Sequence, residues 1–193
     1  MLFRSVFETG RPEVWGLRAL IAATASVGIA ASLYLGWSFS LTRRAIEEDD
    51  IALRINRLSA HAPNALGNAA HFKGLAASYY RVFQASGDAK VLESALKAAA
   101  HAGELNPADP EPVKMEGQYL LSFYQISGEE EFGRRSILKL GRAHEMSPGD
   151  VDICIARAWA ARLSGDLEGE ALWWSRAIEL EPHDLMSHAR LAR

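Results

Sequence analysis

A module that recurs along the chain constrains the fold more than any other feature. Its first copy runs from Ser86 to Pro107, its second from Ser127 to Pro148 at an offset of 41 residues, and a shorter third from Ser164 to Pro182. Each copy opens with Ser-Gly and an acidic residue, and closes with Ala, Glu, an apolar residue and Pro. Self-similarity at a fixed period is typical of stacked repeats, in which a unit needs neighbours to cover its apolar face. The sequence therefore predicts a repeat scaffold.

The third copy resembles the tetratricopeptide repeat (TPR), a helix-turn-helix of about 34 residues. Trp174, Ala177 and Pro182 stand at the aromatic, small and terminal proline places of that pattern, and Gly165-Asp166 at the turn between the helices. The spacing is 34 residues from Pro148 to Pro182, but 41 in the preceding copy, which indicates longer helices and turns there. The resemblance covers residues 64–193 and implies an all-α fold, an α-solenoid of about three TPR-like helix pairs plus a terminal helix.

The helices of this array can be placed from their caps and apolar spacing. Asn64 is expected to cap a first helix that runs to about Phe83. Asp109 or Glu111, each followed by a proline, is expected to open the third helix. The other expected helices cover residues 89–103, 129–144, 150–163 and 167–180, with a terminal helix from 183.

The N-terminal part has a different composition. Residues 1–18 form a charged tail, and no charged residue occurs over the 23 positions from Ala19 to Leu41. A helix of that length is about 34 Å long, enough for a hydrocarbon core of roughly 30 Å. We predict a single transmembrane helix over 19–41 and a juxtamembrane helix or linker over 42–63, which Pro63 ends. The alternative is a cleaved signal peptide.

Small side chains recur every four residues inside the predicted span, at Thr24, Gly28, Ser32 and Gly36. Such a transmembrane packing stripe lets another helix backbone approach closely. It predicts docking onto another membrane helix, including a homodimer through the stripe. The alternative is that these residues only reflect an alanine-rich and glycine-rich composition.

The expected location is the bacterial inner (cytoplasmic) membrane, as a single-pass protein. Three arginines precede the span and four follow it within about 20 residues, so the positive-inside rule favours neither orientation strongly. We favour the periplasmic over the cytoplasmic side for the repeats, because a short N-terminal tail before a single anchor usually stays inside. The net charge of −3 and the lack of a basic block argue against a nucleic-acid partner.

No constellation of residues here meets the requirements of catalysis. The six histidines are scattered, none at the helical spacing of a zinc site, and no phosphate-binding glycine loop or nucleophile turn occurs. We expect no enzyme activity, no cofactor and no metal. The single cysteine, Cys154, excludes an internal disulfide and is expected in the core, the alternative being a reactive thiol.

The TPR resemblance implies recognition of a protein segment in the groove lined by the first helix of each pair. The groove positions of the family, carried over to this sequence, are Ala77, Arg81, Gln118, Ser122, Gln125, Ile155, Trp159 and Arg162. Trp159 and Arg162 are the expected anchors, since Trp and Arg dominate binding hot spots. The alternative is that Trp159 packs on a neighbouring helix and Arg162 lies over it. Trp174 is expected in the core, and Trp173 against the last helix at Met186 or His188.

The sequence thus predicts a non-catalytic, membrane-anchored TPR scaffold. It would act as an accessory or assembly subunit of a larger membrane complex through protein–protein contacts. The alternative is a transient adaptor or chaperone-like factor for client proteins or peptides, of the kind that serves envelope or cytochrome c biogenesis.

Overall fold

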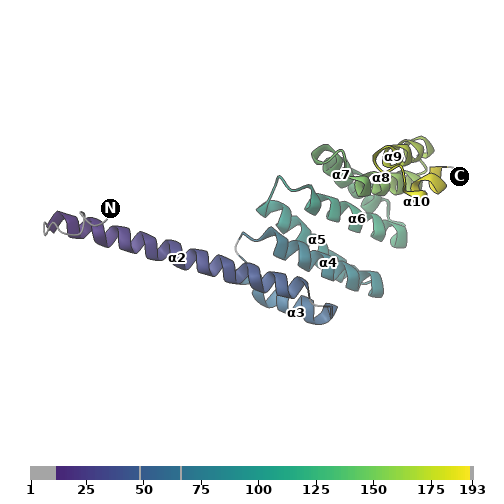
Figure 1. The fold of residues 1–193 in the computed structure, drawn as a ribbon. Coiled ribbons are helices and arrows are strands. Elements are labelled where there is room, and N and C mark those ends of the chain that lie inside the picture. The colour runs from purple at the N-terminus through teal and green to yellow at the C-terminus, as the bar shows by residue number, and fades with distance from the viewer. Residues whose placement is uncertain (1–11, 48, 66, 192–193) are drawn as a thin grey trace.

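The computed structural model describes residues 12–47, 49–65 and 67–191, and every regular element in these ranges is helical (Figure 1). The all-α prediction is therefore confirmed for the described residues. The α-helices are α2 (Pro12–Ile46), α3 (Ile51–His61), α4 (Ala69–Ser86), α5 (Ala89–Leu105), α6 (Pro110–Ser127), α7 (Glu130–Met146), α8 (Val151–Ser164), α9 (Leu167–Leu180) and α10 (Leu185–Leu191), and a 3₁₀ turn, η1, covers Ala62–Asn64.

Six of these helices form three consecutive pairs. The helices of each pair, α4 with α5, α6 with α7, and α8 with α9, pack on each other, and each second helix also contacts the first helix of the next unit. The pairs follow one another toward the C-terminal end, where α10 packs on α9, while α2 extends away from the array (Figure 1). This arrangement confirms the predicted α-solenoid of three pairs and a terminal helix.

The recurring Ser-Gly-acid motif is the turn inside each pair. Gly87, Gly128 and Gly165 end the first helices with φ of 68°, 71° and 78°, the left-handed conformation that favours glycine. Asp88 and Asp166 then cap the second helices, each accepting a backbone N–H of the next turn. One short motif thus ends one helix and starts another, which is why it recurs.

The entrance to the array differs from the prediction. Asn64 lies in η1, and Asn68 caps the first repeat helix by accepting the N–H of His71 at 3.3 Å. The predicted linker over 42–63 contains the end of α2, then α3 and η1. Asp50 starts α3 by accepting the N–H of Leu53 at 3.0 Å, so α2 and α3 are separate helices.

The predicted membrane span lies inside α2. In the part of the chain that the structure describes, no helix combines the length and the apolarity that crossing a membrane requires. The predicted transmembrane helix over 19–41 is thus not supported by the structure. The predicted tail over 1–18 lies outside the described residues as far as residue 11.

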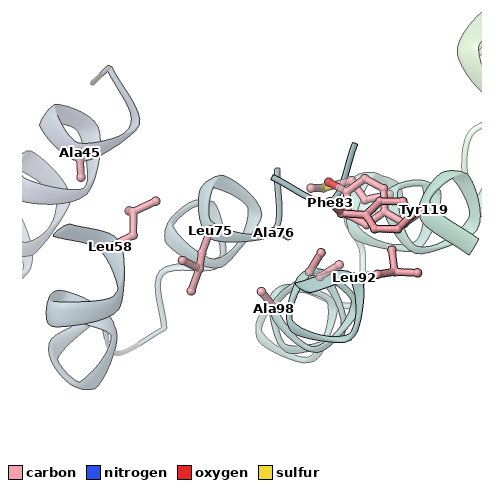
Figure 2. Close-up of a cluster of buried hydrophobic side chains, with 11 residues drawn as sticks. Ala45, Leu58, Leu75, Ala76, Phe83, Leu92, Ala98 and Tyr119 are labelled. Carbon is pink, nitrogen blue, oxygen red and sulfur yellow. The ribbon is translucent and has the colours of Figure 1, made fainter. Parts of the chain in front are cut away.

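The end of α2 shares its core with the first repeat. Figure 2 shows Ala45 of α2 and Leu58 of α3 in one buried cluster with Leu75 of α4, and with Phe83 and Tyr119 further along. The cluster also contains the apolar face of α5, including Leu92 and Ala98 (Figure 2). A smaller core joins α6, α7 and α8 through Leu121, Leu140, Ala156 and Ala160. Burial of these faces stabilises the array by about 25 cal/mol per Å² of apolar surface.

A buried polar cluster fastens α2 to α4. The hydroxyl of Thr42 lies 3.1 Å from Nδ1 of His71, and the side-chain amide of Asn68 donates to the same hydroxyl at 3.3 Å. His71 is fully buried. Burial lowers the pKa of His71 below its usual value, outweighing the opposing effect of the backbone of Leu58.

We expect the fold to lose stability as pH falls below about 6.5, the usual pKa of an unfolded histidine. A histidine with a lowered folded-state pKa binds its proton more readily in the unfolded chain, so its contribution is complete above that pH and is lost below it. Burial also lowers the pKa of His144, which adds to the slope. Urea unfolding at pH 7.5, 6.5 and 5.5 measures this dependence.

Single variants separate the two histidines. His71→Gln and His144→Gln should each flatten the dependence on pH, although they lower stability at neutral pH. An unchanged slope in both variants contradicts this assignment.

Candidate protein-binding groove

The predicted groove residues of the second unit belong partly to the contact between units. The ring of Tyr80 in α4 stacks on that of Tyr119 in α6 at 4.0 Å between centroids and 12° between planes. The Tyr80 hydroxyl also hydrogen-bonds to that of Ser122. Burial raises the pKa of Tyr119, which keeps this phenol neutral. Ser122 therefore helps to join two repeats, a role that the sequence does not indicate.

The other predicted residues of the first two units are scattered along α4 and α6. Arg81 and Gln125 are exposed, Gln118 is half-buried and Ala77 packs against the buried core of the first repeat, and none of the four lines either cavity described below. That these residues line a binding groove stays a prediction.

The predicted residues of the third unit lie together. Ile155 and Trp159 of α8 line a cavity of about 550 Å³ between the start of α8 and α10. Arg190 of α10 closes one side of it. The remaining lining residues are mostly acidic and comprise Gly149, Asp150, Val151, Asp152, Glu181 and Asp184.

A second cavity, of about 330 Å³, continues from the first. Arg190 lines both, and Arg162, the other predicted anchor, belongs to the second. The guanidinium of Arg162 pairs with the Glu170 carboxylate at 3.2 Å, which also accepts a hydrogen bond from the indole of Trp174 at 3.2 Å. Arg162 is therefore already held by the second helix of its own unit.

Trp159 stands between core and cavity. Its ring meets that of Trp174 edge to face, with 5.9 Å between centroids and 80° between planes. The Arg190 guanidinium lies 4.6 Å from the Trp159 ring centroid, and that of Arg162 lies 5.8 Å away. The two interpretations of Trp159 are thus compatible, because one edge packs on a neighbouring helix while the side chain also lines a cavity.

Trp173 packs on the two helices that precede α9. Its ring packs against His144 of α7 at 5.0 Å, and the Arg157 guanidinium of α8 lies 3.6 Å from its centroid. These contacts are with α7 and α8, and the predicted contact with α10 at Met186 or His188 stays a prediction. Trp174 and Cys154 are buried as predicted, and burial raises the pKa of the thiol.

A further exposed apolar surface covers α2. Thr24, Gly28, Ser32 and Gly36 are all exposed, and a Cβ added at either glycine would meet no atom within 4 Å. Large apolar side chains are exposed on the same helix, namely Val27, Ile29, Leu33, Leu35, Trp37 and Phe39. A contiguous exposed apolar surface on a protein usually marks an interaction site. The predicted packing role of the stripe stays a prediction.

Sequence reasoning missed Arg190, which lies between the two cavities. The third copy of the motif ends at Pro182, so nothing in the repeat pattern singled out a residue of α10. The signal available was the start of a fourth unit at residue 183, since the first helices of the preceding units supply the predicted groove residues.

Comparison with known proteins finds similarity among solved structures. No protein family model matches the chain, and no curated protein matches it. Among solved structures, the crystal structure of YrrB, described as a TPR protein with an unusual peptide-binding site, is similar to this chain. It is 15% identical, the match covers 81% of this chain and 90% of that chain, and the TM-score is 0.43. The helical-repeat fold therefore rests on the helix pairs themselves.

Proposed function

We propose that this protein is a non-catalytic scaffold that binds a segment of another protein in the cavities beside α8 and α10. The observation that carries the proposal is Trp159, half-buried on the wall of a cavity with Arg190 across its ring. A large aromatic group beside a guanidinium is the composition typical of binding hot spots.

The elongated shape of the site suits an extended peptide segment. The two cavities, of about 550 and 330 Å³, meet at Arg190 and follow the side of α8 from Asp150 to Arg162. That stretch of helix is about 18 Å long, and an extended segment spans about 3.3 Å per residue, so five or six residues would follow this side of the helix. The mixed acidic, basic and aromatic lining suits the side chains of such a segment.

The test is selection of binders from a displayed library of random dodecapeptides, followed by affinity measurement with the purified chain. Trp159→Ala should weaken the selected peptides at least tenfold, the effect of losing one anchor. Trp37→Ala, which removes an exposed Trp from α2, is the matched control and should leave affinity unchanged. Equal affinities of the two variants, or no selected peptide at all, contradict the proposal.

The residence time of a bound segment distinguishes a permanent subunit from a transient adaptor. Dissociation over hours supports an accessory subunit of a larger complex, and dissociation within seconds supports an adaptor. Membrane attachment and the periplasmic location stay predictions. Neither is needed for binding in these cavities.

A further inference from the structure

The first helices of successive units are joined by a repeated ion pair. Lys73 of α4 contacts Asp109, the N-cap of α6, with 2.8 Å between Nζ and Oδ2. Lys114 of α6 contacts Asp150, the N-cap of α8, at 3.1 Å. Each lysine stands five residues after the N-cap of its own helix, and the two pairs are offset by 41 residues. We call this contact the inter-repeat ion pair.

The third unit lacks the lysine of this pair. Five residues after the N-cap Asp150 stands Ile155, and the next first helix, α10, begins beside Asp184, whose carboxylate accepts the N–H of Ser187 at 3.1 Å. Ile155 and Asp184 both line the cavity of about 550 Å³. The place that a lysine side chain fills in the two preceding units is therefore part of an open cavity here.

The charge around this cavity is predominantly negative. Among the residues that the structure describes, the carboxylates of Asp150, Asp152, Glu181 and Asp184 line it, together with the guanidinium of Arg190. Lys114 lies close by but is shared, at 2.8 Å from Glu111, 3.1 Å from Asp150 and 3.8 Å from Asp152. One ammonium thus serves three carboxylates, which leaves an excess of negative charge at the cavity. Asp152 and Glu181 are exposed, so this charge faces an approaching ligand.

We propose that this cavity receives a lysine or arginine side chain from the bound protein segment, which takes the place that Lys73 and Lys114 occupy in the preceding units. Trp159 contacts the apolar part of the same segment, next to the cation. The bound segment thereby continues the inter-repeat ion pairs of the scaffold. This inference rests on the proposed function and specifies the chemistry of its partner, a basic residue beside an apolar one.

The test uses the random dodecapeptide library and the whole chain. Selected peptides should be enriched in Lys or Arg beside an apolar residue and depleted in Asp and Glu. Ile155→Lys supplies the missing lysine from the scaffold itself, so it should weaken these peptides at least tenfold while the chain stays folded by circular dichroism. Ile126→Lys makes the same change at an exposed site at the end of α6 and should leave binding unchanged.

A second pair of variants avoids any change in side-chain volume. Asp152→Asn with Glu181→Gln removes two exposed charges from the cavity and should weaken the basic peptides several-fold, with a smaller dependence of affinity on salt. Glu104→Gln with Glu129→Gln removes two exposed charges elsewhere and is the control. These two double variants test the proposal if Ile155→Lys does not fold.

The outcomes separate this inference from the proposed function. Peptides that show no preference for basic residues, or that bind Ile155→Lys as tightly as Ile126→Lys, overturn the inference. If those peptides are still lost in Trp159→Ala, the proposed function stands without it. If no peptide is selected, both fail.

Discussion

Trp174→Ala is expected to lower the free energy of unfolding by about 3–5 kcal/mol, the usual cost of truncating a fully buried Trp. Trp174 is only 1% exposed and packs edge to face on Trp159. Its indole also donates to Glu170 at 3.2 Å, which in turn pairs with Arg162. The substitution therefore opens a void in the third unit and removes a hydrogen bond to Glu170, which lines the smaller cavity.

Urea unfolding followed by circular dichroism measures this loss. Leu172→Ala is the matched control two residues away on α9, where the side chain is 62% exposed, and it should change stability by less than about 0.5 kcal/mol. Because repeat arrays can unfold in stages, the third unit is expected to unfold first in Trp174→Ala. A single transition at the urea concentration of the wild type contradicts the prediction.

Gly117→Ala should destabilise the second unit although alanine favours helices. A Cβ at Gly117 in α6 would lie 2.8 Å from the Leu140 side chain and 3.1 Å from the Leu140 backbone nitrogen in α7. The carbonyl of Gly117 also accepts a hydrogen bond from the Ser136 hydroxyl at 2.9 Å, so the two helices are held close together. Forcing them apart should cost about 1–3 kcal/mol, as overpacking of a core does.

Gly141→Ala isolates that cost. Gly141 lies in α7, and a Cβ there would meet nothing within 4 Å, so this variant should gain the helix propensity of alanine, about 1 kcal/mol. Since the gain is common to both variants, their thermal midpoints should differ by the overpacking term alone. With about 2 kcal/mol of difference, Gly117→Ala should melt roughly 4–8 °C below Gly141→Ala. Equal midpoints would show that the helices separate without cost.

The sequence predicted the array well because the signals there are local. The Ser-Gly-acid turns need a left-handed glycine, and in the first and third copies the acid also caps the next helix, so the turns at Gly87, Gly128 and Gly165 could be recognised from the chain alone. The predicted helix over 167–180 matches α9, since Asp166 caps it and Glu181 follows its last residue. Such features depend only on neighbouring residues.

Features that depend on packing between distant residues were less predictable. The reversal between α2 and α3 depends on packing that brings Ala45 and Leu58 into one core, and the local pattern of residues 42–63 does not specify it. The packing of Trp173 depends on the position of Arg157 in α8, and the apolar spacing of α9 does not specify it. Of the candidate site, the sequence identified Ile155, Trp159 and Arg162, but the cavity also needs Arg190 from α10.

The shared core of α2 and the first repeat has a mechanical consequence. Because Ala45, Leu58 and the pair of Thr42 with His71 fasten the end of α2, the helix cannot swivel freely on the array. A helix of 35 residues is about 52 Å long. Whatever α2 contacts near its far end is held at a set distance from the first repeat, so this helix works as a spacer of fixed length.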